Sequence, residues 1–415
     1  MPPANQQWQQ VLVIPVFNEA PTLLDTLAQL NTDAGKVLVI LVLNRPENCL
    51  DSEINSPVRD ALSRLPASEA LGPSSHLAML APDVSVLTID LETETGATPA
   101  DKGVGLARKI GCDVALHWIM QDAINTQWIC SSDADALLPR DYFNRLSADN
   151  SQSAALLFPF IHTASGEPLS DEACLRYELR LHHYVLGLQY AASPYAFHTL
   201  GSCIAVRATN YAKVRGFPAR SAAEDFYLLN KLAKTGAVTQ ATGECIVLSS
   251  RPSDRVPFGT GPAIRNLAAS SQMADAELYY HPEIFNSLRA VLLAAAMRYD
   301  HNTEFTELLQ TQGLNAAHAQ RAYEQLDAMG VEKALQHCRI QAGDAASFSK
   351  HFHQWFDGFR TLKFIHGLRD SGYKDLNLAE LARRHPDFWP GGVKAEDLAQ
   401  CRAAILNNWQ WLTTD

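Results

Sequence analysis

The sequence predicts an α/β protein built on an open, mostly parallel sheet flanked by helices, followed by an all-helical C-terminal domain. Its apolar runs are continuous rather than alternating, which is typical of strands buried on both faces of a parallel sheet. Helical periodicity lies between these runs, so strands and helices alternate along the chain. Strand-like runs end near residue 265, and helical periodicity dominates from there to residue 415.

The first two strands are the apolar runs "VLVIPVF" (11–17) and "VLVILVL" (37–43). Between them, "PTLLDTLAQL" places Leu23, Leu27 and Leu30 on one helical face. This order of strand, helix and strand predicts a β-α-β unit.

The sheet continues with strands at "SVLTIDL" (85–91) and "QWICSSDAD" (127–135), separated by a long helix over 102–124. Residues 46–84 hold several Pro, Ser and Asn residues and one short helical patch over 58–65. We therefore expect an insert or long loop over the sheet edge there.

Strand and helix patterns alternate again in the second half of the first domain. They are an apolar run at 154–161, a helix near 171–192, a strand at 202–208, a helix near 223–235 and a strand at 244–250. A chain of 415 residues is too long for one typical core, so two domains are expected. We place them at 1–265 and 266–415.

The overall charge argues against nucleic acid and against an anionic membrane surface as main partners. The net charge is −11, and the sequence holds no basic block. An anionic substrate stays open, because one local arginine cluster is enough to bind it.

The cysteine pattern and the hydropathy predict a cytoplasmic protein without a transmembrane segment. The 8 cysteines are dispersed and never form a C-x-x-C pair, which favours neither a zinc site nor a disulfide framework. The first residues lack the basic start and long apolar core of a signal peptide. The longest apolar runs are too short to cross a bilayer.

The segment "SSDADA" (131–136) is the sharpest chemical feature. Asp133 and Asp135 end an apolar strand, and their two-residue spacing points both carboxylates to one face. Two such carboxylates repel each other unless a cation lies between or beside them. A divalent cation, Mn²⁺ or Mg²⁺, held together with substrate phosphates fits this pattern. The alternative is a solvated turn or a helix cap.

A second acidic pair, Glu224 and Asp225, begins a helix in "AAEDFYLLNKLAKTG" (222–236). Simple helix capping is the alternative, because negative charge is favoured at a helix N-terminus. The preceding "GSCIAVRATNYAKVRGFP" (201–218) indicates a strand, a short helix and a glycine turn that deliver the pair.

Over roughly residues 10–260, the order and spacing of five segments resemble the family 2 glycosyltransferases of the GT-A fold. The segments are "VIPVFNEAPTL", "GVGLARKIG", "SSDADA", "GSCIAVRATNYAKVRGF" and "AEDFYLLNKL". The resemblance implies a nucleotide-sugar donor, UDP- or another NDP-sugar, and an unidentified hydroxyl acceptor. It also implies that the D-x-D aspartates, Asp133 and Asp135, hold the metal on the diphosphate and that the later acidic pair supplies the catalytic base.

Several further residues are binding candidates, most of them implied by the resemblance; Arg251 and Arg255 are candidates because they lie beside a glycine-rich turn in "SSRPSDRVPFGTGPA" (249–263), where guanidinium and backbone N–H groups bind phosphate. The donor-binding candidates are Pro15, Phe17, Asn18, Glu19, Asn44, Arg108, Asp133, Arg251 and Arg255. The acceptor-binding candidates are Tyr195, His198, Gly201 and Ser202. An ordinary surface loop around Arg251 and Arg255, a solvated helix face at Arg108 and a structural histidine at His198 are the alternatives.

The end of the second strand departs from the family pattern. Members usually carry an acidic cluster there that helps hold the base, whereas "VLNRPEN" has Asn44. An amide donates as well as accepts hydrogen bonds, so the base of the donor stays undetermined.

The implied mechanism assigns the metal to the departing diphosphate and the base to the acceptor hydroxyl. We assign the base to Asp225, with Glu224 in support. Family members typically invert the anomeric centre, but the residues do not distinguish inversion from retention. Two rival functions stay open. One is a nucleotidylyltransferase, which would carry a glycine-rich basic signature after the first strand, where this chain has "VFNEAPTL". The other is a non-catalytic sugar-nucleotide sensor or scaffold.

Overall fold

The computed structural model describes residues 2–3, 6–146, 152–251, 260–270, 272–300, 303–384, 394 and 397–409. The chain divides into two compact units. We call residues 1–171 with 199–266 the sheet unit, and residues 172–198 with 267–415 the helical unit.

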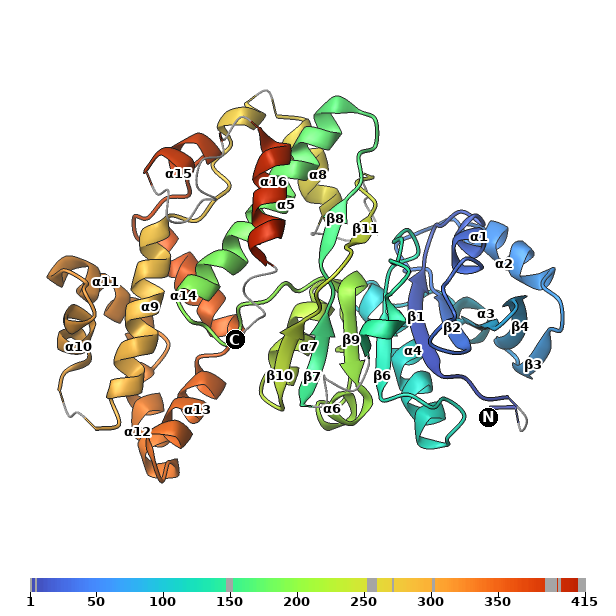
Figure 1. Cartoon of the computed structure of the whole chain (residues 1–415), viewed down its shortest axis with the longest axis horizontal. Coiled ribbons are helices and arrows are strands. Elements are labelled where there is room, and N and C mark those ends of the chain that lie inside the picture. The colour runs from blue at the N-terminus through green and yellow to red at the C-terminus, as the bar shows by residue number, and fades with distance from the viewer. Residues whose placement is uncertain are drawn as a thin grey trace. The chain divides into compact units, whose positions relative to one another are not determined.

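A mixed, mostly parallel sheet organises the sheet unit (Figure 1). Within the described ranges it has nine strands in the order β10-β7-β9-β6-β1-β2-β5-β4-β3. Only β4 and β9 run against the others, which confirms the predicted fold class. The strands are β1 (Gln10–Val16), β2 (Val37–Leu43), β3 (Glu69–Gly72), β4 (Ser75–Ala81), β5 (Val84–Asp90), β6 (Trp128–Ser131), β7 (Ser153–Leu157), β9 (Ile204–Arg207) and β10 (Ala237–Gln240). A separate parallel pair joins β8 (Phe160–His162) to β11 (Ile246–Leu248).

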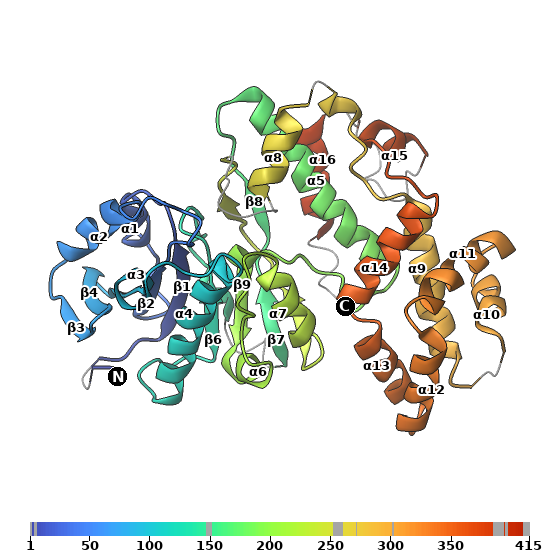
Figure 2. The ribbon, with the colours of Figure 1, turned by 180° about the vertical axis from the view of Figure 1, so that it is seen from behind.

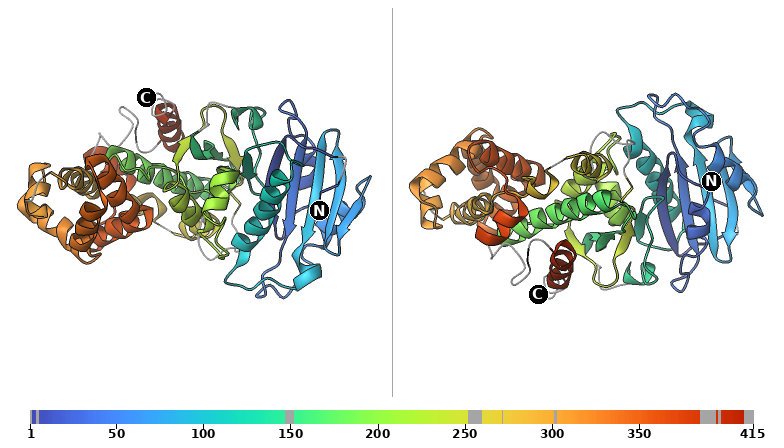
Figure 3. Two further views of the ribbon diagram at one scale, coloured as in Figure 1. Left: turned by 90° about the horizontal axis from the view of Figure 1, so that it is seen from below. Right: turned by 90° about the horizontal axis from the view of Figure 1, so that it is seen from above.

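The continuous apolar runs become the central strands. Every residue of β2 is buried, and β2 pairs in parallel with β1 on one side and β5 on the other. The strands standing side by side are seen in Figure 3. A strand enclosed in this way needs apolar side chains on both faces, which is why the run shows no alternation.

Helices α4, α6 and α7 pack against one face of the sheet (Figure 2). The long helix α4 lies close to β1 and β2. A Cβ on Gly111 would be 2.4 Å from Cγ1 of Val13 and 3.0 Å from Cγ2 of Val42. Helices of the sheet unit are α1 (Leu23–Leu27), α2 (Ser56–Ser63), α3 (Leu91–Thr95), α4 (Gly103–Met120), α6 (Ala208–Lys213), α7 (Glu224–Leu232) and the 3-10 turns Phe143–Leu146 and Gly201–Cys203.

The segment 46–84 differs from its prediction. It contains the expected helix, α2, but it also contributes β3 and β4, which extend the main sheet as an antiparallel hairpin. The alternative of a long loop is therefore wrong, and the hairpin escaped prediction because β3, "EALG", is short and largely exposed and carries no apolar run.

The helical unit has a core of its own, formed by aromatic and aliphatic side chains such as Phe285, Phe352, Phe356 and Phe364. Its described helices are α5 (Pro168–Tyr190, from Glu172 on), α9 (Pro282–Met297), α10 (Phe305–Thr311), α11 (Ala316–Asp327), α12 (Val331–Gln341), α13 (Ala345–Trp355), α14 (Gly358–Asp370), α15 (Leu378–Arg384) and α16 (Leu398–Trp409). Helix α8 (Thr260–Ala268) crosses the division at residue 266, and Met273–Asp275 is a 3-10 turn.

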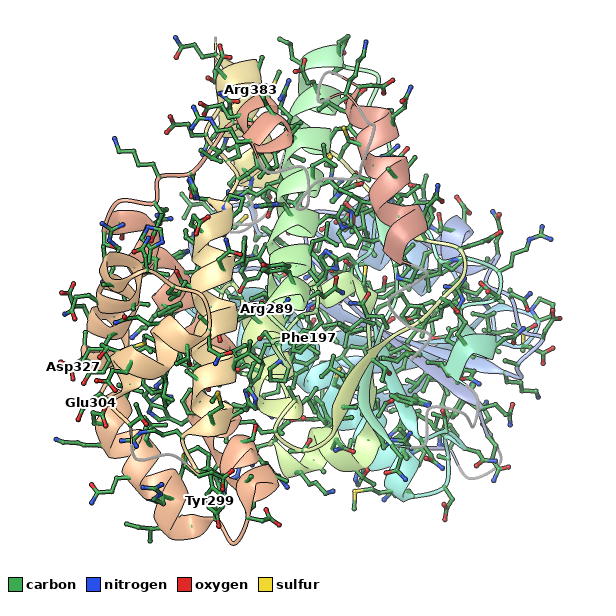
Figure 4. All side chains as sticks on the ribbon, turned by 60° about the vertical axis from the view of Figure 1, so that its left-hand side comes forward. Phe197, Arg289, Tyr299, Glu304, Asp327 and Arg383 are labelled. Carbon is green, nitrogen blue, oxygen red and sulfur yellow. The ribbon has the colours of Figure 1, made fainter. Side chains whose placement is uncertain are left out.

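A polar contact between α9 and the end of α5 holds these helices together inside the helical unit (Figure 4). Arg289 of α9 donates from Nη1 to the carbonyl of Tyr190, 3.1 Å away, and its guanidinium lies over the Tyr190 ring. Residues 172–198, which the boundary at 265 leaves in the first domain, therefore belong to the packing of the helical unit.

Candidate active site

The turn after β1 and the D-x-D segment lie at the same edge of the sheet. β1 and β6 are parallel neighbours with Val13 opposite Ser131, so their carboxyl ends point the same way. After β1 the chain turns at Asn18, whose φ of 55° is a left-handed conformation that asparagine tolerates. Ligands of open α/β sheets bind beyond the carboxyl ends of the strands, so this edge is the candidate site.

Arg251 connects the first-strand turn to the D-x-D segment. Its Nη2 donates to both carboxylate oxygens of Glu19, at 2.7 and 2.8 Å, and lies 3.3 Å from Oδ2 of Asp135. Burial lowers the pKa of the Arg251 guanidinium, but Glu19 and Asp135 raise it more strongly, so it stays above its usual value. Three residues assigned to the donor or the metal are thus brought together from distant parts of the chain.

Arg108 of α4 connects the D-x-D segment to the second acidic pair. The side chain is only 4% exposed, and its guanidinium donates to Oδ1 of Asp133 from Nη2 and to Oε1 of Glu224 from Nε, the latter over 3.0 Å. Nη1 donates to Oγ of Ser131 at 2.7 Å and to the carbonyls of Ser132 and Gly201 at 3.3 and 3.1 Å. Burial lowers the pKa of Arg108, but Asp133, Glu224 and Asp225 together raise it above its usual value.

Glycines make room for this buried arginine. A Cβ on Gly201 would lie 2.7 Å from Nη2 of Arg108 and 2.8 Å from its Cζ. A Cβ on Gly105 would lie 2.5 Å from the carbonyl oxygen of Arg220, which accepts the N–H of Gly105 over 2.9 Å. Gly201 therefore lets the segment before β9 approach the Arg108 guanidinium closely, and Gly105 lets the backbone of residues 218–220 approach α4.

Glu224 and Asp225 begin α7 directly after Ala223, whose φ of 58° is left-handed. Glu224 is buried against Arg108. Asp225 is partly exposed, and its carboxylate accepts the backbone N–H groups of Gly201 (2.9 Å) and Phe226 (2.6 Å).

The surroundings of Asp225 favour its protonated form. Burial and the charge of Glu224 raise the pKa of Asp225 to about 7, against the opposing effects of the Phe226 N–H, Arg108 and the Gly201 N–H. A carboxylate with a pKa in this range is suited to accept a proton near neutral pH.

The end of β2 carries a polar network that the sequence analysis missed. The fully buried Asn55 accepts the N–H of Asn18 through Oδ1 (3.0 Å), and its Nδ2 donates to the carbonyl of Asn44 (3.1 Å) and to Oε2 of Glu92 (3.2 Å). Asp90 ends β5 opposite Leu43, so acidic residues stand beside Asn44 even though Asn44, and not an acid, directly follows β2.

Two arginines neutralise these acids: Arg59 donates to Asp90 and Glu92, and Arg45 donates to Glu92. The sequence signal that was available for this network is Asp90, an acid at the end of the predicted strand 85–91.

The acceptor-side candidates are divided between the two units. Gly201 and Ser202 are buried in the 3-10 turn before β9. Tyr195 is buried in the helical unit, where its hydroxyl donates to the carbonyl of His353 over 2.7 Å. His198 packs edge-on against His182, with ring centroids 5.0 Å apart, and burial with the charge of His182 holds its pKa well below the usual range.

Pro15 lies in β1 opposite Val42, and Phe17 follows the strand; both are half-buried at the candidate edge. Arg255 lies outside the described residues. The acceptor and donor roles of the candidate residues stay predictions.

The D-x-D carboxylates have the chemistry of a hard-cation site, although each is paired with an arginine. Among the described residues, no group of three or more His, Cys, Asp and Glu side chains is arranged to hold a metal ion. Asp135 makes the longer contact, 3.3 Å, to the half-exposed Arg251, whereas Asp133 is hydrogen-bonded to the buried Arg108. The assignment of a cation to Asp135 and Asp133 stays a prediction, and substrate phosphates would have to supply further ligands.

Comparisons with known proteins leave the family of the chain undetermined. No protein-family model matches the sequence, and a search of curated proteins gives no match.

Among solved structures, the chain is similar to S. aureus TarS 1-349 in complex with UDP-GlcNAc, at 15% identity, TM-score 0.38, and 98% and 90% coverage of this chain and that one. It is also similar to mannosyltransferase PcManGT from Pyrobaculum calidifontis in complex with GDP-Man and Mn²⁺, at 15% identity, TM-score 0.34, and 84% and 88% coverage.

In the part of the chain that the structure describes, no helix is both long and apolar enough to span a membrane.

Proposed function

We propose that this protein transfers a sugar from a nucleotide-sugar donor to a hydroxyl acceptor, with inversion at the anomeric carbon and with a divalent cation at the D-x-D aspartates. The observation that carries this proposal is the Arg108 contact network. It brings Asp133, assigned to the donor side, and Glu224, assigned to the acceptor side, onto one buried guanidinium. A helix cap or a solvated turn would not need this arrangement.

In the proposed reaction, the oxygen of the acceptor hydroxyl attacks the anomeric carbon while Asp225 accepts the proton of that hydroxyl. The N–H of Gly201 orients this carboxylate, and Glu224 helps to keep its pKa near neutrality. Glu19 and Arg251 line the donor side next to Asp135. When bound, Mn²⁺ or Mg²⁺ would be held by Asp135, with Asp133 assisting, and would neutralise the departing diphosphate as a Lewis acid.

The base of the donor is expected to lie at the carboxyl ends of β1 and β2. A connected network of backbone and side-chain hydrogen bonds lies there, formed by Asn44, Asn18 and Asn55. At the end of β2 the amide Asn44 takes the place where the family usually has an acid. We further propose that the sheet unit carries the catalysis and that the long helix α5 serves the helical unit.

A donor screen tests this function. Thermal stability is measured with UDP-, GDP- and other nucleotide sugars, with and without Mn²⁺, and nucleotide release is then measured for each donor that stabilises the protein. We expect one donor class to stabilise in a Mn²⁺-dependent way and to be turned over, and Asp225→Asn to keep the stabilisation and lose the turnover. Stabilisation of the parent without any turnover would favour the sensor function, and no stabilisation by any donor would overturn the proposal.

A further inference from the structure

One buried side chain, Arg108, contacts both halves of the proposed site. Nη2 is on Asp133 and Nε is on Glu224, while Nη1 donates to the carbonyl of Gly201. A guanidinium holds its N–H groups in a rigid planar fork. The two carboxylates are therefore held in fixed positions relative to each other. A lysine ammonium at this place would have no such fork.

Gly201 provides a second path to the proposed base. Its carbonyl accepts from Arg108, and its N–H donates to Oδ2 of Asp225 over 2.9 Å. A displacement of the guanidinium would thus be felt by both members of the acidic pair, Glu224 directly and Asp225 through the Gly201 peptide.

Asp133 keeps one oxygen for a ligand while the other is held. Oδ1 is on Arg108, whereas Oδ2 accepts no hydrogen bond among the described residues, and the side chain is 42% exposed. Asp133 is therefore oriented from the protein side and open on the solvent side. This is the usual arrangement of a metal-binding carboxylate and its supporting hydrogen bond.

We propose that Arg108 is a positioning residue that couples cation binding at the D-x-D aspartates to the placement of Glu224 and Asp225. The inference rests on the proposed function and extends it: the donor side and the acceptor side are linked by one shared guanidinium. Arg108 acts on the metal through Asp133 and on the proposed base through Glu224 and Gly201.

A purely structural role gives a different expectation. In that case Arg108 only neutralises the buried Glu224, whose uncompensated charge would destabilise the fold. Substituting either residue would then lower the stability but leave the cation affinity of the folded protein unchanged.

Mn²⁺ titration separates the two roles without measuring turnover. Free Mn²⁺ is counted by its electron paramagnetic resonance signal, with UDP and then GDP present at saturation. Loss of an outer hydrogen-bond partner of a metal ligand typically weakens metal binding roughly 10- to 100-fold, so we expect a loss of this size in Arg108→Lys.

Glu224→Gln is the decisive variant. With the charge of residue 224 removed, the amide holds Nε of Arg108 less strongly than the carboxylate does, so the guanidinium orients Asp133 less firmly. We expect Mn²⁺ to bind roughly 3- to 30-fold more weakly, the range of energetic coupling between linked sites. This variant keeps the size of the side chain and keeps Arg108 in place, so it decides the question even if Arg108→Lys does not fold.

Asp113→Asn is the matched control for the loss of a carboxylate charge. Asp113 is also on α4 but pairs with Lys109 at 2.8 Å and accepts from the Tyr211 hydroxyl, without contact to Arg108. The Mn²⁺ affinity of Asp113→Asn should stay within about twofold of the parent, a smaller change than the one expected for Glu224→Gln.

Parent-like Mn²⁺ affinity in folded Glu224→Gln would overturn the coupling. Failure of the parent itself to bind Mn²⁺ with either nucleotide would be a different result and would overturn the proposed function.

Discussion

The pH dependence of sugar transfer is a direct consequence of the surroundings of Asp225. Burial and the charge of Glu224 raise the pKa of this carboxyl to about 7. The free enzyme governs kcat/KM, so this parameter should follow the ionised fraction of Asp225. That fraction is about one tenth at about pH 6 and about nine tenths at about pH 8, by the ordinary titration relation. We expect kcat/KM to rise about tenfold across this interval.

Two variants separate Asp225 from other titrating groups. Asp225→Asn has no carboxylate to ionise, so its residual rate should be roughly 10²- to 10⁴-fold lower and flat over the same interval. Glu224→Gln removes one of the two main causes of the raised pKa, so the midpoint should move to lower pH.

The assay measures nucleoside diphosphate released from the donor that the screen identifies, with water or an added alcohol as acceptor. The product is separated by chromatography, so that no coupling enzyme adds a pH dependence of its own. A parent profile that is flat from about pH 6 to about pH 8, or an Asp225→Asn variant that keeps the rising limb, would refute the assignment of the base.

The same shift has a consequence for folding. The folded-state pKa of Asp225 is higher than that of an unfolded aspartate, so the folded chain holds this proton more tightly between the two values. The contribution of Asp225 to the free energy of unfolding is complete below about pH 4 and is lost as the pH rises through about 7. Chemical denaturation of the parent and of Asp225→Asn at several pH values measures this contribution. A parent that gains stability relative to Asp225→Asn as the pH rises from about 4 to about 7 would show that folding lowers the pKa of Asp225 and would contradict the assignment.

Three further predictions follow from packing and from the D-x-D carboxylates. Asp135→Asn should weaken Mn²⁺ binding at least about tenfold, as counted by paramagnetic resonance with UDP present, and unchanged binding would contradict the metal assignment. Gly111→Ala should lower the free energy of unfolding by roughly 1–2 kcal/mol in urea, because overpacking against β1 exceeds the gain in helix propensity; Gly72→Ala, with no atom within 4 Å of its Cβ, is the control and should change little. A chain ending at residue 266 should aggregate or unfold at lower urea concentration, because the apolar face of α5 packs inside the helical unit, and an unchanged unfolding midpoint would contradict that packing.

The strands that the sequence predicted well are those whose burial leaves a local mark. β2 is buried on both faces along its whole length, so its pattern is an unbroken apolar run. β3 and β10 lie at the two edges of the sheet, and none of their residues is buried. Edge strands of this kind are held by backbone hydrogen bonds to a neighbour, and a backbone bond has no sequence signature.

The candidate site was predictable only where chemistry and local pattern coincide. Asp133 and Asp135 end an apolar strand, so a strand prediction alone places them at the sheet edge. Asn55 carries no such signal. It lies in a segment without strand pattern, and its importance comes from three hydrogen bonds to residues 11 to 37 positions away.

Arg108 shows that a buried charge leaves a signal in the sequence when its position is compared with the buried face of its helix. The buried positions of α4 include Gly105, Arg108, Cys112 and Ala115, at spacings of three, four and three residues. These spacings keep to one helical face, and every other member of the set is small or apolar. The neighbouring Lys109 falls off that face, and its side chain is 33% exposed.

An arginine in phase with the small buried residues of a helix must find its partners inside the protein, because an unpaired buried charge is too costly. The motif around Arg108 predicts either a phosphate-binding arginine or a solvated helix face. The phase favours a third role, an internal link between acids delivered by other segments, and this is where the structure places the side chain.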